Sequence, residues 1–300
     1  MRAPERACPL CDGPASGPAF PYSIRFANQI FRYVRCRDCR TVFVDPVPDA
    51  ACFAQMYDKA NYHDSFYSAN DLTPYRQAAA LLRQFAQPDS SILDYGCGVG
   101  HFLQAVKAEG FDPYGVEFDA PAAAAAAVHA GCPVVTVADL DRAYAGQLFD
   151  VIHLGDVLEH LPDPAATLAG LLTRLKPGGL LFVEGPLETN PSPVYWAARL
   201  FGGVKHRLRP AEIGAGVPTH LFRTSALAQS RFFRHRFPNL QPLYWQVSES
   251  GWPYAQGNWI KRQLAAAAIA LGGKNLVGTQ LGNRFAAFYT SRSKGVEVLH

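Results

Sequence analysis

The chain has 300 residues, of which 49% are hydrophobic and 18% are charged, and its formal net charge is only +3. This composition is that of a globular protein with a sizeable core, and the small net charge argues against a protein built mainly to grip nucleic acid. No apolar run approaches the roughly 18 residues of a membrane-spanning helix, and the N-terminus lacks the pattern of a secretory signal. We therefore expect a cytoplasmic protein with one main domain and a small accessory unit.

Residues 1–48 contain two Cys-x-x-Cys pairs, Cys8 with Cys11 and Cys36 with Cys39. Seven cysteines are an odd number for a disulfide framework, and paired spacing of this kind favours metal binding in a reducing compartment. The segment resembles a zinc ribbon, in which four thiolates close a tetrahedral site and leave no place for water. We expect a structural zinc ion here, with a redox pair or fortuitous cysteines as the alternatives.

Residues 49–88 are expected to form a linker and a cap helix. The part up to residue 72 is rich in Tyr and Asn and shows no clear period. Pro74 suits the first turn of a helix, and apolar residues at Leu81 and Leu82 continue a helical period until Pro88 ends it.

From residue 89 onward we expect the main domain, in which short apolar strands alternate with helices. This alternation predicts an α/β fold with a Rossmann-like, doubly wound parallel sheet. Two later apolar segments would close the sheet, for seven strands in all. The expected strands are Ser91–Asp94, Tyr114–Val116, Pro133–Val137, Asp150–Leu154, Leu180–Glu184, Leu240–Val247 and Arg284–Thr290. The expected helices cover about 99–109, 120–130 and 163–175.

The first of these strands ends in Asp94 and runs into a loop with Gly96, Gly98 and Gly100 at alternate positions. Glycines permit positive φ and let a ligand approach the backbone closely. The spacing differs from the dinucleotide fingerprint G-x-G-x-x-G, because His101 stands where that pattern continues. An acid at the strand end would repel a diphosphate but could hold a cationic amino acid group. The loop therefore favours S-adenosylmethionine over NAD.

Two further acids follow the next strands. Glu117 ends the second strand, where it could accept hydrogen bonds from both ribose hydroxyls, as such acids do in nucleotide-binding sheets. Asp139 follows the third strand, where an adenine amino group could be read. Asp156 lies close to the end of the fourth strand and is expected to meet the cofactor or the acceptor.

Together with the segment from Asp150 to His160 and the turn Pro177-Gly178-Gly179, these residues closely resemble the class I S-adenosylmethionine-dependent methyltransferases. The resemblance covers roughly residues 73–185. It implies that the cofactor is S-adenosylmethionine, bound by the first-motif residues, the ribose acid and the adenine-side acid, which here are Asp94, Gly96, Gly98, Gly100, Glu117 and Asp139.

The order of the cysteine pairs, the Tyr-bearing linker and the methyltransferase motif also looks like a recurrent bacterial arrangement. Its relatives include C-methyltransferases that act on nucleotide-linked deoxysugars. This second resemblance implies a small-molecule acceptor, with a sugar or a nucleotide-linked sugar as the candidate.

Residues from about 186 to 230 are punctuated by Pro and Gly and suit an active-site lid or a short helical insertion. Oxygen and carbon acceptors usually need a proton removed, so a base near the transferred methyl group is expected. His160, after the fourth strand, and His220, in the lid, are the two candidates. A structural or cofactor-side histidine is the alternative for His160, and the neighbouring His153, inside the strand, is expected to be packed.

Three functions remain open from the sequence. The first is methyl transfer to a small molecule. The second is an RNA-directed methyltransferase that binds RNA through the zinc ribbon and the basic lid segment Lys205–Arg209, although the modest charge disfavours a nucleic-acid partner. The third is a scaffold without catalysis. The oligomeric state is left undetermined.

Overall fold

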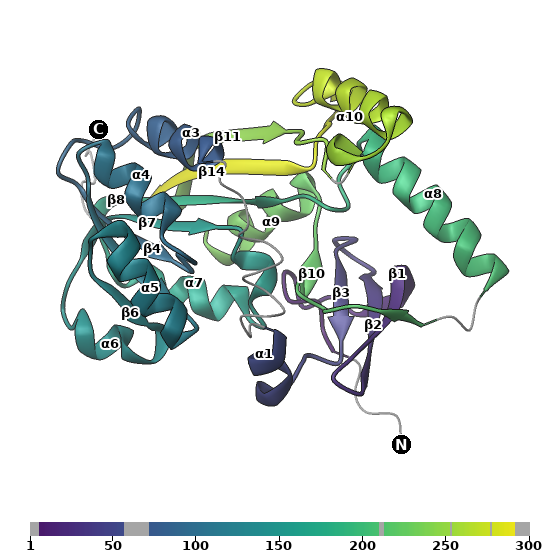
Figure 1. Ribbon diagram of the computed structural model, residues 1–300, viewed down its shortest axis with the longest axis horizontal. Coiled ribbons are helices and arrows are strands. Elements are labelled where there is room, and N and C mark those ends of the chain that lie inside the picture. Colours follow the sequence, from purple (N-terminus) through teal and green to yellow (C-terminus); the bar gives the residue numbers. More distant parts are fainter. Residues whose placement is uncertain (1–5, 57–71, 210–212, 253, 277, 292–300) are drawn as a thin grey trace, which may run out of the picture.

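The computed structural model describes residues 6–56, 72–209, 213–252, 254–276 and 278–291. These residues form a large seven-stranded sheet flanked by helices, and a smaller five-stranded sheet that contains the N-terminal segment (Figure 1). Every helix in the described part of the chain is too short or too polar to span a lipid bilayer.

The large sheet has the strand order β11-β14-β8-β7-β4-β5-β6. Five neighbouring strands are parallel, and β14 pairs antiparallel with β8 and with β11. The predicted α/β doubly wound sheet with seven strands is therefore confirmed. Its strands are β4 (Ser91–Tyr95), β5 (Asp112–Glu117), β6 (Val134–Thr136), β7 (Phe149–Gly155), β8 (Leu175–Pro186), β11 (Leu240–Ser248) and β14 (Arg284–Ser291).

Helices cover both faces of this sheet, as the crossover connections of parallel strands require. The helices around it are α3 (Thr73–Leu82), α4 (His101–Ala108), α5 (Ala120–Ala130), α6 (Leu140–Ala143), α7 (Pro164–Leu172) and α9 (Ala226–Arg236). Side chains of Asp119, Asp163 and Ser225 cap the first turns of α5, α7 and α9, as short polar residues do at helix starts. The helix expected over 163–175 ends earlier, because the chain already enters β8 at Leu175.

The core of the large sheet is built from strands that are buried on both faces. The segment Leu180–Val183 of β8 is almost completely excluded from solvent. On one face, the rings of Phe85, Phe288 and Phe182 stack in sequence, with centroid distances of 4.4 and 4.3 Å. This apolar packing holds the predicted cap helix α3 onto the sheet, since α3 shares a buried cluster with these rings.

The smaller sheet, which we call the N-terminal sheet, has the order β10-β3-β2-β1-β9. Three of its strands come from the N-terminus, and β9 and β10 come from the segment expected to be a lid. Phe222 pairs with Phe43 and Arg223 with Val42, so β10 extends the edge of β3. The strands are β1 (Ala15–Phe26), β2 (Gln29–Cys36), β3 (Val42–Asp45), β9 (Gly214–Ala215) and β10 (Phe222–Arg223).

The segment expected as a lid also contains a long helix, α8 (Pro193–Leu208). It contacts β1 at one side and α10 (Trp259–Leu271) at the other, and it projects from the rest of the chain (Figure 1). A short helix, α1 (Ala50–Met56), starts the expected linker. Residues 57–71 of that linker lie outside the described residues.

Candidate active site

The loop after β4 adopts a backbone that only glycine takes without strain. Gly96, Gly98 and Gly100 have φ values of 82°, 55° and 84°, in the left-handed region. The N–H groups of Gly96 and Cys97 both donate to the carbonyl of Val116 on β5, which holds the loop against the neighbouring strand. The loop therefore presents bare backbone at the carboxyl edge of the sheet, where open α/β sheets bind ligands.

Gly96 has a steric requirement in addition to its positive φ. A Cβ atom there would lie 2.6 Å from Cγ2 of Val157, a stiff β-branched side chain. We expect Gly96→Ala to lower the free energy of unfolding by about 3 kcal/mol, from backbone strain and overpacking together. Gly110→Ala is the matched control, because Gly110 has a φ of 87° with no atom within 4 Å of the added Cβ. Equal losses in denaturant titrations of the two variants would contradict the steric requirement.

Glu117, at the end of β5, is tied directly to this loop. Its Oε2 accepts the N–H of Gly98 at 2.7 Å, and its Oε1 accepts the N–H of Phe118 at the same distance. Oε1 also accepts the N–H of Asp119 at 3.4 Å, whereas Oε2 keeps a second lone pair. The carboxylate is thus held rigidly and retains acceptor capacity for a ligand above the sheet edge.

Asp94 is buried, and its Oδ1 lies 2.7 Å from Nδ1 of His153. The parallel register of β4 and β7 pairs these two residues directly. Burial by itself would lower the pKa of His153, but the carboxylates of Asp94 and Glu184 raise it to about 9. His153 is packed, as expected, and the structure adds that it orients Asp94.

The other two predicted cofactor residues lie in different surroundings. Asp139 is bound to the Thr136 hydroxyl and to Arg142, in the short turn after β6. Both carboxylate oxygens of Asp156 accept hydrogen bonds from Nη2 of Arg284, each 2.9 Å long. Asp156 is one of the residues that line the cavity described next, whereas Asp139 is not.

A cavity of about 560 Å³ opens beside the loop, at the carboxyl edge of the sheet. Its lining includes Asp94 and Gly96 from the loop region and both predicted catalytic histidines, whereas Gly98, Gly100 and Glu117 are not among the lining residues. The N-terminal sheet contributes Phe20, Arg35 and Val42 to the wall. Residues from both sheets therefore line the same cavity.

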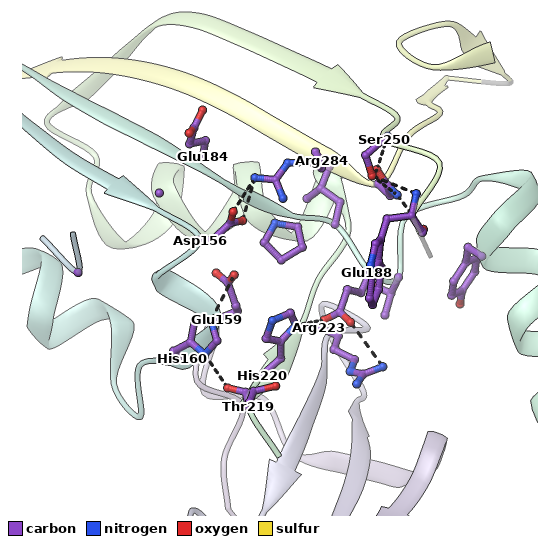
Figure 2. Close-up of a pocket in the computed structure, with 18 of the residues that line it drawn as sticks. Asp156, Glu159, His160, Glu184, Glu188, Thr219, His220, Arg223, Ser250 and Arg284 are labelled. Atoms are coloured by element: carbon purple, nitrogen blue, oxygen red, sulfur yellow. Dashed lines mark hydrogen bonds and ion pairs between the residues drawn. The ribbon is translucent and has the colours of Figure 1, made fainter. Parts of the chain in front are cut away.

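His160 and His220, which are 60 positions apart in the sequence, meet in this cavity (Figure 2). Their ring centroids are 4.9 Å apart, and the rings are nearly perpendicular. Nδ1 of His160 lies 2.7 Å from the carbonyl oxygen of Thr219, and Nδ1 of His220 lies 2.7 Å from Oε2 of Glu188. The structure therefore brings the two predicted catalytic residues together.

Two carboxylates beside these histidines have opposite electrostatic surroundings. Burial raises the pKa of Glu159 to about 8. Burial would also raise the pKa of Glu188, but the positive charges of Arg223 and His220 hold it near 2. Burial lowers the pKa of His160 to about 3, so its imidazole is neutral at ordinary pH. The cavity thus contains a neutral histidine, an ionised Glu188 and, in Glu159, a carboxyl group whose pKa is raised by burial although the positive charges of His220 and Arg284 oppose the shift.

Sequence reasoning did not find Glu188, Arg223 and Arg284 as residues of this site. Glu188 follows β8, and Arg284 begins β14, so both lie near the same sheet edge as the glycine loop. Glu188 comes shortly after the end of a strand, and this position in the sequence could have indicated it as a site residue. The pairing of β10 with β3 that brings in Arg223 has no local signal in the sequence.

The four cysteines of the N-terminal pairs also come together. Cys8, Cys11, Cys36 and Cys39 place their sulfur atoms within 4.8 Å of one another, and two Sγ–Sγ distances are 3.6 and 3.5 Å. Four thiolates around a zinc ion, with Zn–S bonds of about 2.3 Å, would have sulfur atoms about 3.8 Å apart. The cluster therefore fits a single tetrahedral metal ion.

Comparisons with known proteins identify a methyltransferase domain in this chain. A family model described as a methyltransferase domain matches residues 71–252, well over half of the chain. The chain is 32% identical over 171 residues to a ubiquinone biosynthesis O-methyltransferase of Saccharophagus degradans, an alignment covering 55% of this chain and 70% of that protein. A protein of the same name from Bordetella avium is 31% identical over 146 residues, covering 46% of this chain and 58% of that protein.

A solved structure shares the fold at low sequence identity. The 1,6-didemethyltoxoflavin-N1-methyltransferase of Burkholderia thailandensis, solved with S-adenosylhomocysteine, is 16% identical, with a TM-score of 0.55. The match covers 92% of this chain and all of that one. The predicted resemblance is confirmed by these matches and by the seven-stranded sheet. The chain belongs to the methyltransferase-domain family, as an enzyme with the class I S-adenosylmethionine-dependent methyltransferase fold and an N-terminal cysteine cluster.

Proposed function

We propose that this enzyme transfers the methyl group of S-adenosylmethionine to a small-molecule acceptor bound in the cavity between the two sheets. The observation that carries the proposal is that the glycine loop and the two histidines line one cavity of about 560 Å³. That volume suits a small ligand, because small-molecule pockets usually measure roughly 300–1,000 Å³. An RNA acceptor has no comparable support in this geometry.

In the proposed complex, Asp94 faces the amino group of the donor, and Glu117 faces the ribose. Gly96, Gly98 and Gly100 hold the positive φ values that shape the loop whose backbone would face the donor. Asp139 and Asp156 stay predictions as cofactor residues, the first for the adenine amino group. When bound, S-adenosylmethionine supplies an electrophilic methyl group on a positively charged sulfur. The chain's own work is to orient the acceptor, exclude water and handle the acceptor's proton.

The acceptor class follows from two separate supports. The curated relatives are named for O-methylation in ubiquinone biosynthesis, which favours oxygen as the methylated atom. The order of the cysteine module and the methyltransferase motif favours a sugar or a nucleotide-linked sugar, whose acceptor atom is carbon or oxygen. We propose a hydroxyl-bearing small molecule as the class that satisfies both supports.

The thiolate cluster is proposed to hold a structural zinc ion. None of the seven cysteines forms a disulfide, which suits a reducing compartment, and we propose the cytoplasm. The boundaries of a zinc module at 1–48, a linker and cap helix at 49–88 and a methyltransferase domain at 89–300 stay predictions.

The proposed function is tested by donor binding and by methyl transfer. Calorimetry should find one saturable site for S-adenosylmethionine per chain. A panel of phenols, sugars and nucleotide-linked sugars, each incubated with donor labelled in the methyl group, should then show transfer to a hydroxyl compound. Absence of donor binding would contradict the proposal. Methyl transfer only to RNA would instead support an RNA-directed methyltransferase.

His220→Asn is expected to lower kcat by about 100-fold or more, because contact with the acceptor and handling of its proton contribute this much in related chemistry. Donor affinity should stay unchanged, since the glycine loop and Glu117 are left intact. His206→Asn is the matched control, because His206 lies on α8, outside the residues that line the cavity. An unchanged kcat for His220→Asn with the identified acceptor would contradict its proposed role.

A further inference from the structure

Three side chains at the cavity wall could ligate one metal ion together. Glu159, His160 and His220, which we call the histidine cluster, each offer one ligand atom, and these three atoms lie within 4.8 Å of one another. Two imidazoles and one carboxylate form a ligand set that divalent first-row transition metals bind, with further coordination positions left open. This cluster is separate from the four cysteines, which belong to the N-terminal segment.

The backbone holds the two halves of the histidine cluster together. Glu159 and His160 lie in the 3₁₀ turn after β7, whereas His220 precedes β10. The N–H of Leu221 donates to the carbonyl of Glu159 at 2.7 Å, which fastens the second segment to the first. The ligand atoms are therefore positioned by main-chain contacts and need no large rearrangement to meet an ion.

The hydrogen bonds of both imidazoles orient them for metal binding. In each ring, Nδ1 faces an oxygen at 2.7 Å, the Thr219 carbonyl for His160 and the Glu188 carboxylate for His220. In the neutral form of each ring, a proton on Nδ1 leaves the lone pair on Nε2, so His220 would release its second proton when a metal ion binds. Metal-binding histidines commonly donate their other ring N–H to a carbonyl or a carboxylate, because this fixes both tautomer and ring orientation.

Glu159 supplies a second, independent observation. Glu159 is only 5% exposed, and among the described residues its Oε1 has no hydrogen-bond partner. The Nε2 atom of His160 lies 3.8 Å from this oxygen, beyond hydrogen-bond distance. A buried carboxylate oxygen without a hydrogen-bond partner is costly, and a bound cation would supply the missing contact to this oxygen.

We propose that Glu159, His160 and His220 bind one divalent transition-metal cation, which faces the acceptor half of the cavity. The inference deepens the proposed function and rests on it, since the cation would contact the acceptor's hydroxyl oxygen. An oxygen bound to a divalent cation loses its proton at a lower pH than a free hydroxyl does. The two histidines would then act on the acceptor as metal ligands, and its proton would leave to water.

The test is a titration of the zinc-loaded full chain with Mn²⁺, which binds thiolates weakly and has a strong paramagnetic signal. We expect one bound Mn²⁺ per chain beyond the zinc, with spin-echo modulation from two imidazole nitrogens. Glu159→Gln and His220→Gln should each weaken Mn²⁺ binding at least tenfold, while circular dichroism reports their folding. Glu109→Gln and His206→Gln are matched controls outside the histidine cluster, and both should bind Mn²⁺ as the parent chain does.

Two results would overturn the inference. One is absence of stoichiometric Mn²⁺ binding to the folded chain, and the other is binding that neither cluster variant weakens or that lacks the imidazole signal. Donor calorimetry and methyl transfer without Mn²⁺ report on the proposed function separately. Full methyl transfer by a chain that binds no Mn²⁺ would leave the proposed function intact and remove the metal ion.

Discussion

Cys36→Ser is expected to release the zinc ion and to unfold the N-terminal sheet. Cys36 is completely buried at the end of β2, and its sulfur is one of four that surround the predicted ion. Apparent binding free energies of structural zinc sites reach about 10–16 kcal/mol, and in small modules this energy is folding energy. Elemental analysis should fall from about one zinc per chain to near zero, and amide exchange in β1 to β3 should become fast.

Cys52→Ser is the matched control for this prediction. Cys52 is equally buried and packs in the apolar cluster of the same sheet, but its sulfur is outside the four-cysteine group. The variant should lose some stability from its buried hydroxyl while it keeps one zinc per chain. A metal-free parent chain with a fully protected N-terminal sheet would contradict the zinc site.

Glu117→Ala is expected to reduce the affinity for S-adenosylmethionine by about 100-fold. The proposed contacts to the ribose are charge-assisted hydrogen bonds, each worth about 1.5–3 kcal/mol. The substitution also removes the acceptor of the Gly98 N–H, which loosens the loop that the donor lies against. Calorimetric titration with S-adenosylmethionine measures the loss directly.

The neighbouring Asp119→Ala separates this effect from a loss of stability. The Asp119 side chain caps α5 by accepting the N–H of Ala122, so its removal should cost about 1 kcal/mol of stability. Donor affinity should remain that of the parent chain, because Asp119 has no proposed contact with the ribose. Equal donor affinities for Glu117→Ala and the parent chain would refute the ribose role of Glu117.

The N-terminal sheet has a direct consequence for acceptor binding. Arg35 on β2, Val42 on β3 and Arg223 on β10 lie in one row across paired strands, and all three line the cavity. Loss of zinc should therefore disturb acceptor binding as well as stability, whereas the donor loop belongs to the other sheet. The Cys36 variant thus also reports on how the two sheets share the site.

Local sequence patterns were sufficient to predict the large sheet and the glycine loop. Alternating apolar strands and helices, the acid at the end of β4 and the glycines with positive φ are properties of short segments, so they can be recognised without a structure. The two cysteine pairs are recognisable for the same reason. These patterns led to the α/β fold and the methyltransferase family, which the sheet and the family match confirm.

The sequence by itself thus determined the sheet, its first loop and the cysteine cluster, because each depends on periodicity or on close spacing. Only the tertiary structure decided that Asp94 meets His153, that His160 meets His220, and that β10 joins the N-terminal sheet. These contacts depend on strand register and on the return of a distant segment, and many alternative registers are compatible with the same local pattern. The physical reason is that side chains far apart in the chain meet only after the backbone has closed the long loops between them.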